Sequence, residues 1–261
     1  MKKQKSKPNK ISGKPKVMVM AGYGLNCEEE TKFAFEWAGG LADIVHLNDL
    51  LARPQILTEY SNLAFPGGFA YGDDTGSGKA YANKFKNHLS GELKEFLSRD
   101  TLLIGICNGF QIVTNLGILP GALTYNKTGK YLDRFVDLKV SGRSPWLKNM
   151  KSISVPIAHG EGRFIIGSSE YKKLKQNKQI AFTYEKGKIC KFQNLEKNPN
   201  CSLYDIAGVL AYNGRVLGLM PHPERAMFPH QSPLWQKNKN AVKEGEGLQI
   251  FKNAINYFKK R

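Results

Sequence analysis

The sequence predicts an α/β fold with a mostly parallel, doubly wound sheet, helices on both faces of that sheet, and additional antiparallel strands. Between residues 16 and 117, short apolar runs alternate with segments of helical period. From residue 131 onward, strand-like runs follow one another closely. Strands that alternate with helices are typical of parallel pairing, because a parallel strand needs a long crossover connection.

Four strands and the helices between them are expected in the first half of the chain. The strands are predicted at 16–24, 42–47, 62–68 and 101–106. A helix is predicted over 26–40, with Asn26 as its N-cap and Glu29 completing a capping box. Its apolar face would consist of Phe33, Ala34 and Trp37. Further helices are expected over 80–98 and directly after residue 107.

The second half is expected to be rich in strands and to end in an amphipathic helix over 246–260. Strand-like runs lie at 133–140, 152–158, 163–167, 179–184, 205–212 and 215–220. The sequence has no internal repeat and no sign of a second domain. We therefore expect one domain over 16–261, preceded by a disordered basic tail over 1–15.

The composition is that of a globular protein with a substantial core. Of 261 residues, 41% are hydrophobic and 23% are charged. No apolar run approaches the roughly 18 residues of a membrane span, and no signal-peptide core follows the basic N-terminus. We expect a cytoplasmic protein whose four cysteines are free thiols, and their spacing predicts no metal site.

The net charge of +17 raises the possibility of a nucleic-acid partner. Seven of the lysines lie within the first 16 residues, and others cluster at 171–179 and at the C-terminus. These lysines are not interleaved with aromatic residues as in a stacking groove, so they are interpreted as solvated surface. A nucleic-acid partner is not expected, although a basic binding module acting through the tail stays an alternative.

A cysteine flanked by glycines marks the turn between the strand at 101–106 and the following helix. Cys107, with Gly105 and Gly109 on either side, matches the G-x-S-x-G nucleophile elbow with cysteine in the central place. The sharp turn leaves no room for side chains two positions away. The sulfur would then project above the sheet at a helix N-terminus, where the helix dipole favours the thiolate. The alternative is an inert core cysteine.

A cysteine nucleophile requires a base, and the segment "LGLMPHPER" offers one. His222 and Glu224 are two residues apart, so in extended backbone their side chains point to the same side. Pro221 and Pro223 are expected to keep the segment from becoming helical. Glu224 would then orient the imidazole, whereas the alternative is a surface ion pair with Arg225 nearby.

Acyl transfer also requires donors for an oxyanion. The N–H of Asn108 follows the nucleophile directly, and Gly68, at the end of the neighbouring strand, can offer a second N–H. The segment "GDDTGSGKA" is not a phosphate-binding P-loop, because its glycine spacing is wrong and Ala80 follows the lysine. No bound nucleotide is expected.

The sequence resembles a known family, the triad class (class I) of glutamine amidotransferases, which have a flavodoxin-like fold. The shared segments are "FPGGFAYGD", "GICNGFQ", "VPIAHGEGRF" and "LGLMPHPER". More narrowly, "AHGEGRF", the opening "GYGLNCEEETKFAFEWAG" and the later "NPNCSLYDIAGV" are similar to the glutaminase subunits of phosphoribosylformylglycinamidine synthase, from purine biosynthesis. The resemblance covers residues 16 to 258.

The resemblance implies an activity and a partner. Cys107 would attack the side-chain amide of L-glutamine, and His222, held by Glu224, would move the protons. Ammonia would pass to a synthetase subunit that uses ATP and magnesium to convert formylglycinamide ribonucleotide to formylglycinamidine ribonucleotide, with a small accessory subunit in the complex. This chain would bind no cofactor itself, and its activity alone is expected to be low.

The resemblance also implies roles for other residues. Gln111, one helical turn after Cys107, would bind the substrate glutamine, whereas Cys27 is interpreted as a packing residue. Substrate or partner contacts are expected from His159, Glu161 and Arg163, for which a structural ion pair in a turn is the alternative. The chain departs from the family at 74–76, where Asp-Thr-Gly replaces an aromatic residue, leucine and arginine.

Two other activities stay open from the residues alone. The same catalytic residues would serve an amidotransferase that feeds a different acceptor, and only the partner would tell the two apart. A thiol hydrolase or deglycase on a similar fold is the second. Proteins of that kind usually place an acid near the cysteine and lack the His-x-Glu pair that this chain carries at 222–224.

Overall fold

A nine-stranded sheet forms the centre of the computed structural model, which describes residues 13–73, 76–238 and 243–259. The strand order is β2-β1-β3-β4-β11-β10-β9-β6-β7. The bounds are β1 Lys16–Ala21, β2 Leu41–His46, β3 Asn62–Phe65, β4 Leu102–Ile106, β6 Leu132–Val140, β7 Ser152–His159, β9 Ile180–Glu185, β10 Ile206–Ala211 and β11 Val216–Leu219. The sheet is therefore mixed, with a parallel half and an antiparallel half.

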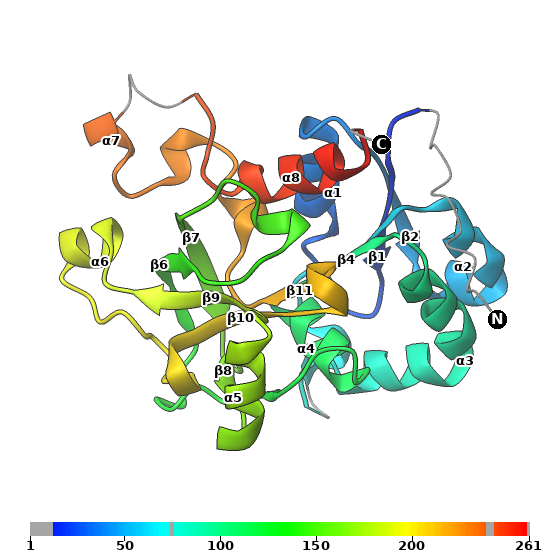
Figure 1. The fold of residues 1–261 in the computed structure, drawn as a ribbon, viewed down its shortest axis with the longest axis horizontal. Helices are drawn as coiled ribbons and strands as arrows, with labels where there is room; N and C mark the ends of the chain where they lie inside the picture. Colours follow the sequence, from blue (N-terminus) through cyan, green and yellow to red (C-terminus); the bar gives the residue numbers. More distant parts are fainter. Residues whose placement is uncertain (1–12, 74–75, 239–242, 260–261) are drawn as a thin grey trace.

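The parallel half consists of β2, β1, β3, β4 and β11, as the alternating pattern predicts. The strands β1, β3, β4 and β11 are buried almost throughout, because helices cover both faces, whereas the edge strand β2 is partly exposed. Figure 1 shows α1 and α8 on one side of these strands and α3 and α4 on the other. The α-helices are α1 Glu28–Trp37, α2 Leu47–Ala52, α3 Lys79–Ser98, α4 Asn108–Asn115, α5 Ser168–Gln176, α6 Lys188–Gln193, α7 Trp235–Asn238 and α8 Leu248–Lys259.

The antiparallel half extends the same sheet through β10, β9, β6 and β7. The predicted run at 163–167 lies outside this sheet. It forms β8 (Arg163–Ile165), which pairs with β5 (Ala122–Thr124), a strand that the sequence pattern did not indicate. The predicted doubly wound α/β fold with additional antiparallel strands is confirmed.

The start of α1 differs from the prediction. Its N-cap is Cys27, which makes no capping hydrogen bond through its side chain, and Asn26 Oδ1 instead lies 3.4 Å from Cys27 Sγ. The buried face contains Phe35 together with Ala34, whereas Phe33 is 45% exposed. The helix begins later than predicted because the N–H groups of residues 26 and 27 both bond to the Gly67 carbonyl. That contact fixes the chain entering α1 against the end of β3.

The three glycine-rich turns after β1, β3 and β4 lie on one edge of the sheet, as predicted. Leu25 forms a bridge with Gly68, which joins the first two turns. In the parallel pairing of β3 with β4, Phe65 stands opposite Gly105, so both strands end at the same level. This edge is where ligands bind in open α/β sheets.

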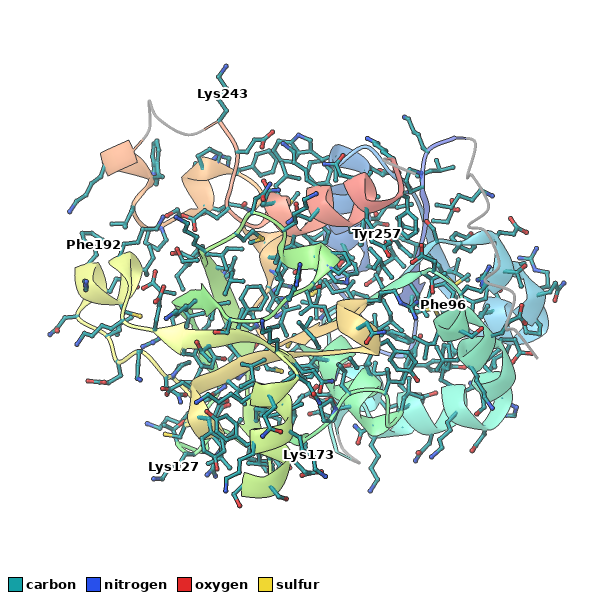
Figure 2. The ribbon with its side chains drawn as sticks, viewed as in Figure 1. Phe96, Lys127, Lys173, Phe192, Lys243 and Tyr257 are labelled. Atoms are coloured by element: carbon teal, nitrogen blue, oxygen red, sulfur yellow. The ribbon has the colours of Figure 1, made fainter. Side chains whose placement is uncertain are left out.

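The lysine-rich segment 171–179 lies mainly on α5 and is mostly exposed. Figure 2 shows Lys173, on this helix, at the outer edge of the molecule. Of the predicted tail, residues 1–12 lie outside the described part of the chain, and β1 begins at Lys16. None of the described helices combines the length and the apolar character that crossing a bilayer requires.

Candidate active site

Cys107 occupies a strained turn between β4 and α4. Its backbone has φ 51° and ψ −109°, a conformation that L-residues rarely adopt, and the residue is the N-cap of α4. A Cβ on Gly105 would lie 2.7 Å from the Gly109 carbonyl oxygen, and a Cβ on Gly109 would overlap the Phe65 carbonyl. The two glycines therefore allow strand, turn and helix to pack as closely as a nucleophile elbow requires.

His222 and Glu224 follow β11, the parallel neighbour of β4. Their side chains are joined by a hydrogen bond of 2.5 Å between His222 Nδ1 and Glu224 Oε1. Both residues are buried, with exposed fractions of 2% and 3%. The proposed alternative of a surface ion pair with Arg225 is therefore wrong, because the carboxylate faces the imidazole inside the protein.

The backbone around His222 is not extended, contrary to the prediction. Residues Pro223–Arg225 form a 3₁₀-helix with proline at its first position. Proline is tolerated there because the first N–H of a helix needs no partner within the helix. The His222 and Glu224 side chains meet across this turn. The backbone N–H of His222 donates to the Pro156 carbonyl of β7 at 2.8 Å, which fixes the backbone of His222 against the sheet.

The sheet brings Cys107 and His222 to one edge. Ile106 at the end of β4 stands opposite Leu219 at the end of β11, and the Cys107 N–H donates to the Leu219 carbonyl at 2.8 Å. Burial opposes protonation of His222, but the Glu224 carboxylate and the Cys107 sulfur outweigh it and raise the pKa of His222 well above its ordinary value. An imidazole of this kind can accept and hold a proton beside the sulfur.

The loop that contains Gly68 is tied to the elbow by Asn108. The side-chain Oδ1 of Asn108 accepts from the Ala70 N–H at 3.0 Å, and its Nδ2 donates to Gln111 Oε1 at 2.8 Å. Gly68 has φ 150°, and its N–H donates to no acceptor among the residues that the structure describes. A buried Asn108 side chain thus holds the loop in register with the turn at Cys107.

Gln111, one turn along α4 from Cys107, has protein partners at both ends of its side chain. Its Nε2 donates to the Glu161 carbonyl at 2.6 Å, while its Oε1 accepts from Asn108. Gln111 therefore joins α4 to the turn after β7. The Glu161 carbonyl belongs to the segment "AHGEGRF", so the structure brings this segment into contact with Gln111.

His159, at the end of β7, is buried and uncharged. Burial lowers the pKa of His159 to about 4, and the positive charge of His222 acts in the same direction. Its Nδ1 lies 3.1 Å from Asn126 Oδ1, and its Nε2 has no hydrogen-bond partner among the described residues. The neighbouring Ala158 carbonyl lies 3.7 Å from Cys107 Sγ, so this strand end contacts the thiol directly.

Arg163 points elsewhere. Its Nε donates to the Cys201 carbonyl at 3.1 Å, and the residue lies on β8, in the small two-stranded sheet. The alternative, a structural ion pair in the turn, is not among the ion pairs found in the described part of the chain. The segment is held instead by Asn126, whose Oδ1 also accepts from the Gly162 N–H at 3.1 Å. Sequence reasoning missed Asn126, because nothing in its local pattern signals the contact.

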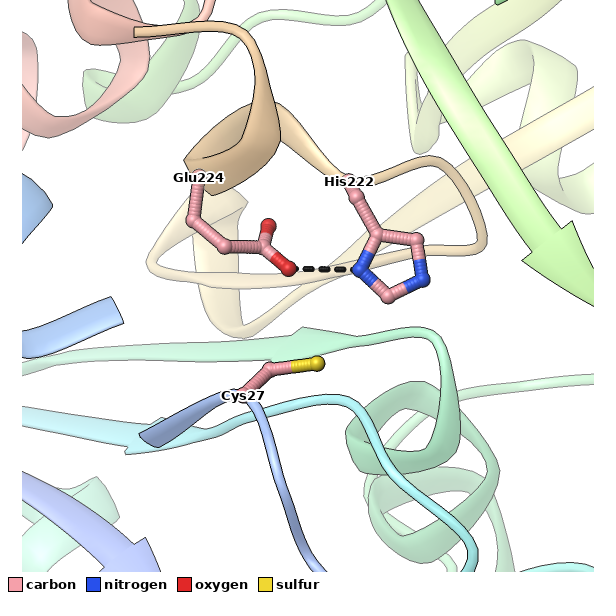
Figure 3. Close-up of side chains that lie close together, drawn as sticks. All are labelled: Cys27, His222 and Glu224. Atoms are coloured by element: carbon pink, nitrogen blue, oxygen red, sulfur yellow. Dashed lines mark hydrogen bonds and ion pairs between the residues drawn. The ribbon is translucent and has the colours of Figure 1, made fainter. Parts of the chain in front are cut away.

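Cys27 lies beside the imidazole rather than in an ordinary core position. Figure 3 shows its sulfur directed toward His222 and Glu224. The atoms with which Cys27, His222 and Glu224 could bind a metal all lie within 4.8 Å of one another. Arg225 Nη2 lies 2.9 Å from the Cys27 sulfur and 3.7 Å from Glu30 Oε1. The packing role assigned to Cys27 therefore describes its burial but not its neighbours.

The family departure at 74–76 is only partly described, since Asp74 and Thr75 lie outside the described residues. Gly78, a few residues on, has φ 73° and is the N-cap of α3. A Cβ there would lie 2.8 Å from the Ile112 N of α4, so the glycine is required by close packing of α3 on α4.

Comparison with known proteins places this arrangement in context. Residues 14–258 match the family model of the CobB/CobQ-like glutamine amidotransferase domain. The chain is 47% identical to phosphoribosylformylglycinamidine synthase subunit PurQ of Methanococcus maripaludis, over 94% of this chain and 98% of that protein. It is 39% identical to the subunit of the same name from Dehalococcoides mccartyi, over 94% and 98% of the two chains.

A solved structure also has the same fold as this chain. A chain from the structure of PurLQS from Thermotoga maritima superimposes with a TM-score of 0.72 at 32% identity, and the match covers 94% of this chain and 99% of that one.

Proposed function

This chain belongs to the PurQ family of glutamine amidotransferases, and on that premise we propose that it is the glutaminase subunit of phosphoribosylformylglycinamidine synthase in purine biosynthesis. It hydrolyses L-glutamine to glutamate and ammonia, and it supplies the ammonia to a synthetase subunit. The observation that carries the proposal is the identity of 47% over 98% of a PurQ subunit. The buried His222–Glu224 pair beside Cys107 is the arrangement that such chemistry needs.

In the first half of the reaction, Cys107 is the nucleophile. Its Sγ attacks the side-chain amide carbon of glutamine while its proton passes to His222. The tetrahedral intermediate collapses as His222 returns the proton to the leaving nitrogen, which departs as ammonia and leaves a γ-glutamyl thioester on Cys107. The raised pKa of His222 suits this step, because the protonated imidazole is stabilised by Glu224 until the proton is transferred.

The intermediate carries a negative oxygen, and two backbone N–H groups are suited to bind it. Those of Asn108 and Gly68 are the proposed oxyanion donors. The Asn108 N–H is at the first residue of α4, where helix N–H groups have no partner within the helix. The hydrogen bond from the Ala70 N–H to the Asn108 side chain supports the idea that both donors are held in one fixed arrangement.

In the second half, water releases the product. His222 removes a proton from a water molecule, the hydroxide attacks the thioester carbon, and the Cys107 sulfur leaves and recovers a proton. Glutamate is the product. The hydrogen bond to Glu224 Oε1 keeps the proton of His222 on Nδ1, so that Nε2 is the atom that exchanges protons in both halves.

Recognition of glutamine is assigned to the elements around Cys107. Gln111 and the segment that carries His159 and Glu161 form one wall, joined by the bond from Gln111 Nε2 to the Glu161 carbonyl. Because Gln111 uses both ends of its side chain within the protein, its part in binding is to hold this wall. Arg163 lies on the far side of the segment and suits a partner contact better than a substrate contact.

The synthetase partner uses ATP and magnesium, and this chain requires neither. A small accessory subunit is part of the proposed complex, and the match to a chain from the structure of PurLQS from Thermotoga maritima supports an assembly with a synthetase. We expect little glutaminase activity from the chain alone, since closure by a partner prevents wasteful turnover in many coupled enzymes.

The test is to measure glutamate formed from glutamine by the chain alone and with the synthetase of the same organism, ATP and formylglycinamide ribonucleotide. Strong stimulation by the partner, lost in Cys107→Ser, is the expected result. Equal rates with and without the partner would leave a glutaminase and remove the purine assignment. An exposed thiol outside the site offers a matched control, since Cys201→Ser should keep the full rate.

A further inference from the structure

A second thiol lies at the His222–Glu224 pair, and the reaction described above does not use it. Cys27, from the turn after β1, is 1% exposed, and its sulfur lies with the two other side chains in one buried cluster (Figure 3). Cys27 is distant in sequence from the other two residues, which is why its spacing along the chain indicated no metal site. A thiol, an imidazole and a carboxylate are three of the side-chain types that bind zinc.

The cluster contains buried polar atoms without partners. Glu224 Oε2 and His222 Nε2 are both buried and make no hydrogen bond among the described residues. Buried polar atoms normally have a partner, so each unpartnered atom requires an explanation. Proton transfer with Cys107 explains Nε2 in the proposed reaction, but it does not explain Glu224 Oε2.

We propose that this cluster is an inhibitory binding site for a thiophilic divalent cation, namely zinc. Its protein ligands are Cys27, His222 and Glu224. On binding, the Cys27 thiol and the protonated His222 each release one proton to the solvent, so that Cys27 binds as thiolate and His222 as neutral imidazole, while Glu224 binds as carboxylate. The two negative ligands balance the charge of the cation. A fourth position stays open for water, as in zinc sites with three protein ligands.

The surroundings of the cluster fit such a site. A Cβ on Gly67 would lie 2.7 Å from His222 Cε1 and 3.1 Å from Cys27 Sγ, so only glycine lets the thiol and the imidazole pack this closely at that point. Arg225 donates to the Cys27 sulfur, and its charge is shared with Glu30. A sulfur can accept an N–H and bind a metal at once, and outer contacts of this kind orient metal ligands.

Inhibition follows from the proposed function, on which this part of the inference rests. An imidazole bound to zinc cannot accept the proton of Cys107 or protonate the leaving nitrogen. Glutaminase turnover and zinc binding therefore exclude each other, and a chelator should restore the activity. The binding itself depends only on the three ligands and can be measured on an inactive protein.

The test is equilibrium dialysis of the full chain against zinc chloride, with metal content read by atomic spectrometry. Cys107→Ser should bind one zinc per chain as tightly as the unaltered protein, and so should the control Cys201→Ser. Cys27→Ser should bind at least about 10-fold more weakly, as should Glu224→Gln, since even outer contacts change metal affinity by that factor. X-ray absorption spectroscopy at the zinc edge, recorded on zinc-loaded Cys107→Ser, should show one sulfur ligand.

Thermal unfolding of each variant shows whether a weaker affinity reflects a lost ligand or a lost fold, and Glu224→Gln serves where Cys27→Ser does not fold. Unchanged zinc binding in Cys27→Ser would overturn the proposal. Loss of binding in Cys107→Ser with retention in Cys27→Ser would overturn it too, because the ion would then sit on the nucleophile. Failure of the glutaminase assay would leave these binding results intact, so the two proposals can fail separately.

Discussion

His222 and Glu224 form a hydrogen-bonded pair, 2.5 Å between Nδ1 and Oε1, in which both side chains are almost fully buried. Burial alone would keep the imidazole neutral, yet the carboxylate and the sulfur of Cys107 reverse that effect and raise the pKa of His222. A low-polarity environment strengthens the attraction between the two groups, because little water screens it. The pair is therefore a proton acceptor whose strength depends on Glu224.

Glu224→Gln should lower kcat for glutaminase by roughly 10⁴-fold, the loss that follows when the orienting acid of a serine triad is replaced by its amide. The amide keeps the size of the side chain but removes the charge, so the pKa of His222 should fall. The measurement is kcat against pH for the complex with the synthetase, in which any limb due to His222 should move to lower pH. A variant with unchanged kcat and an unchanged profile would show that Glu224 does not act on the base.

Gln111→Met should raise the KM for glutamine by roughly 5-fold with a smaller effect on kcat, since the lost hydrogen bond to the Glu161 carbonyl contributes about 1 kcal/mol. Methionine keeps the length of the side chain and removes both polar ends. The turn after β7 would lose its tie to α4.

One turn further along the same helix, Asn115 Nδ2 donates to the Ser77 carbonyl at 3.2 Å, away from the segment with His159. Asn115→Leu therefore breaks a comparable side-chain to backbone bond and should leave the KM for glutamine unchanged. Equal KM values in the two variants would contradict the assignment of Gln111 to the glutamine site.

The elements that position the site were predictable because each depends on local sequence. The apolar run into Cys107, the two glycines and the following helical period indicate the elbow without any tertiary information. The same applies to β1, β3 and β11, whose ends form the edge. The prediction of Asn26 as the N-cap of α1 was wrong because Asn26 and Cys27 donate their backbone N–H groups to the Gly67 carbonyl. Local capping rules do not include a contact this distant in sequence.

Contacts between distant segments account for the other differences. Asn126 holds His159 and Gly162, and Cys27 reaches His222, through pairings that only the folded sheet brings about. The backbone at 223–225 is helical although two prolines suggested otherwise, because proline disfavours a helix interior but not its first turn. Sequence patterns identify chemical groups well, and they identify partners poorly where the partner lies on another strand.

His159→Gln should remove a component of acid sensitivity from folding. The pKa of His159 is about 4 in the folded protein against an ordinary 6.5, so between these values the unfolded chain binds a proton that the folded protein does not. Stability then rises with pH across this window and is lost as pH falls. From pH 7 to pH 5 the loss due to this residue is about 2 kcal/mol.

Urea unfolding at pH 7 and pH 5 measures this effect, with the unaltered protein losing more stability than His159→Gln. Groups such as His222 titrate in both proteins and cancel in the comparison. The exposed histidine His88 provides a control, because His88→Gln should keep the full acid sensitivity. Equal losses for the unaltered protein and His159→Gln would show that His159 is as easily protonated in the folded state as in the unfolded one.

Gly109→Ala should destabilise the fold by at least about 2 kcal/mol, because the new Cβ would overlap the Phe65 carbonyl and force α4 away from β3. Gly91→Ala is the matched control within a helix. It lies in α3, it is exposed, and a Cβ there meets nothing within 4 Å. Helix propensity alone should make that variant more stable by about 0.5–1 kcal/mol. Urea unfolding measures both effects: at unchanged m-values, the midpoint should fall in Gly109→Ala and rise in Gly91→Ala. A stabilised Gly109→Ala would mean that the elbow has room for a side chain and that close packing does not require glycine at this position.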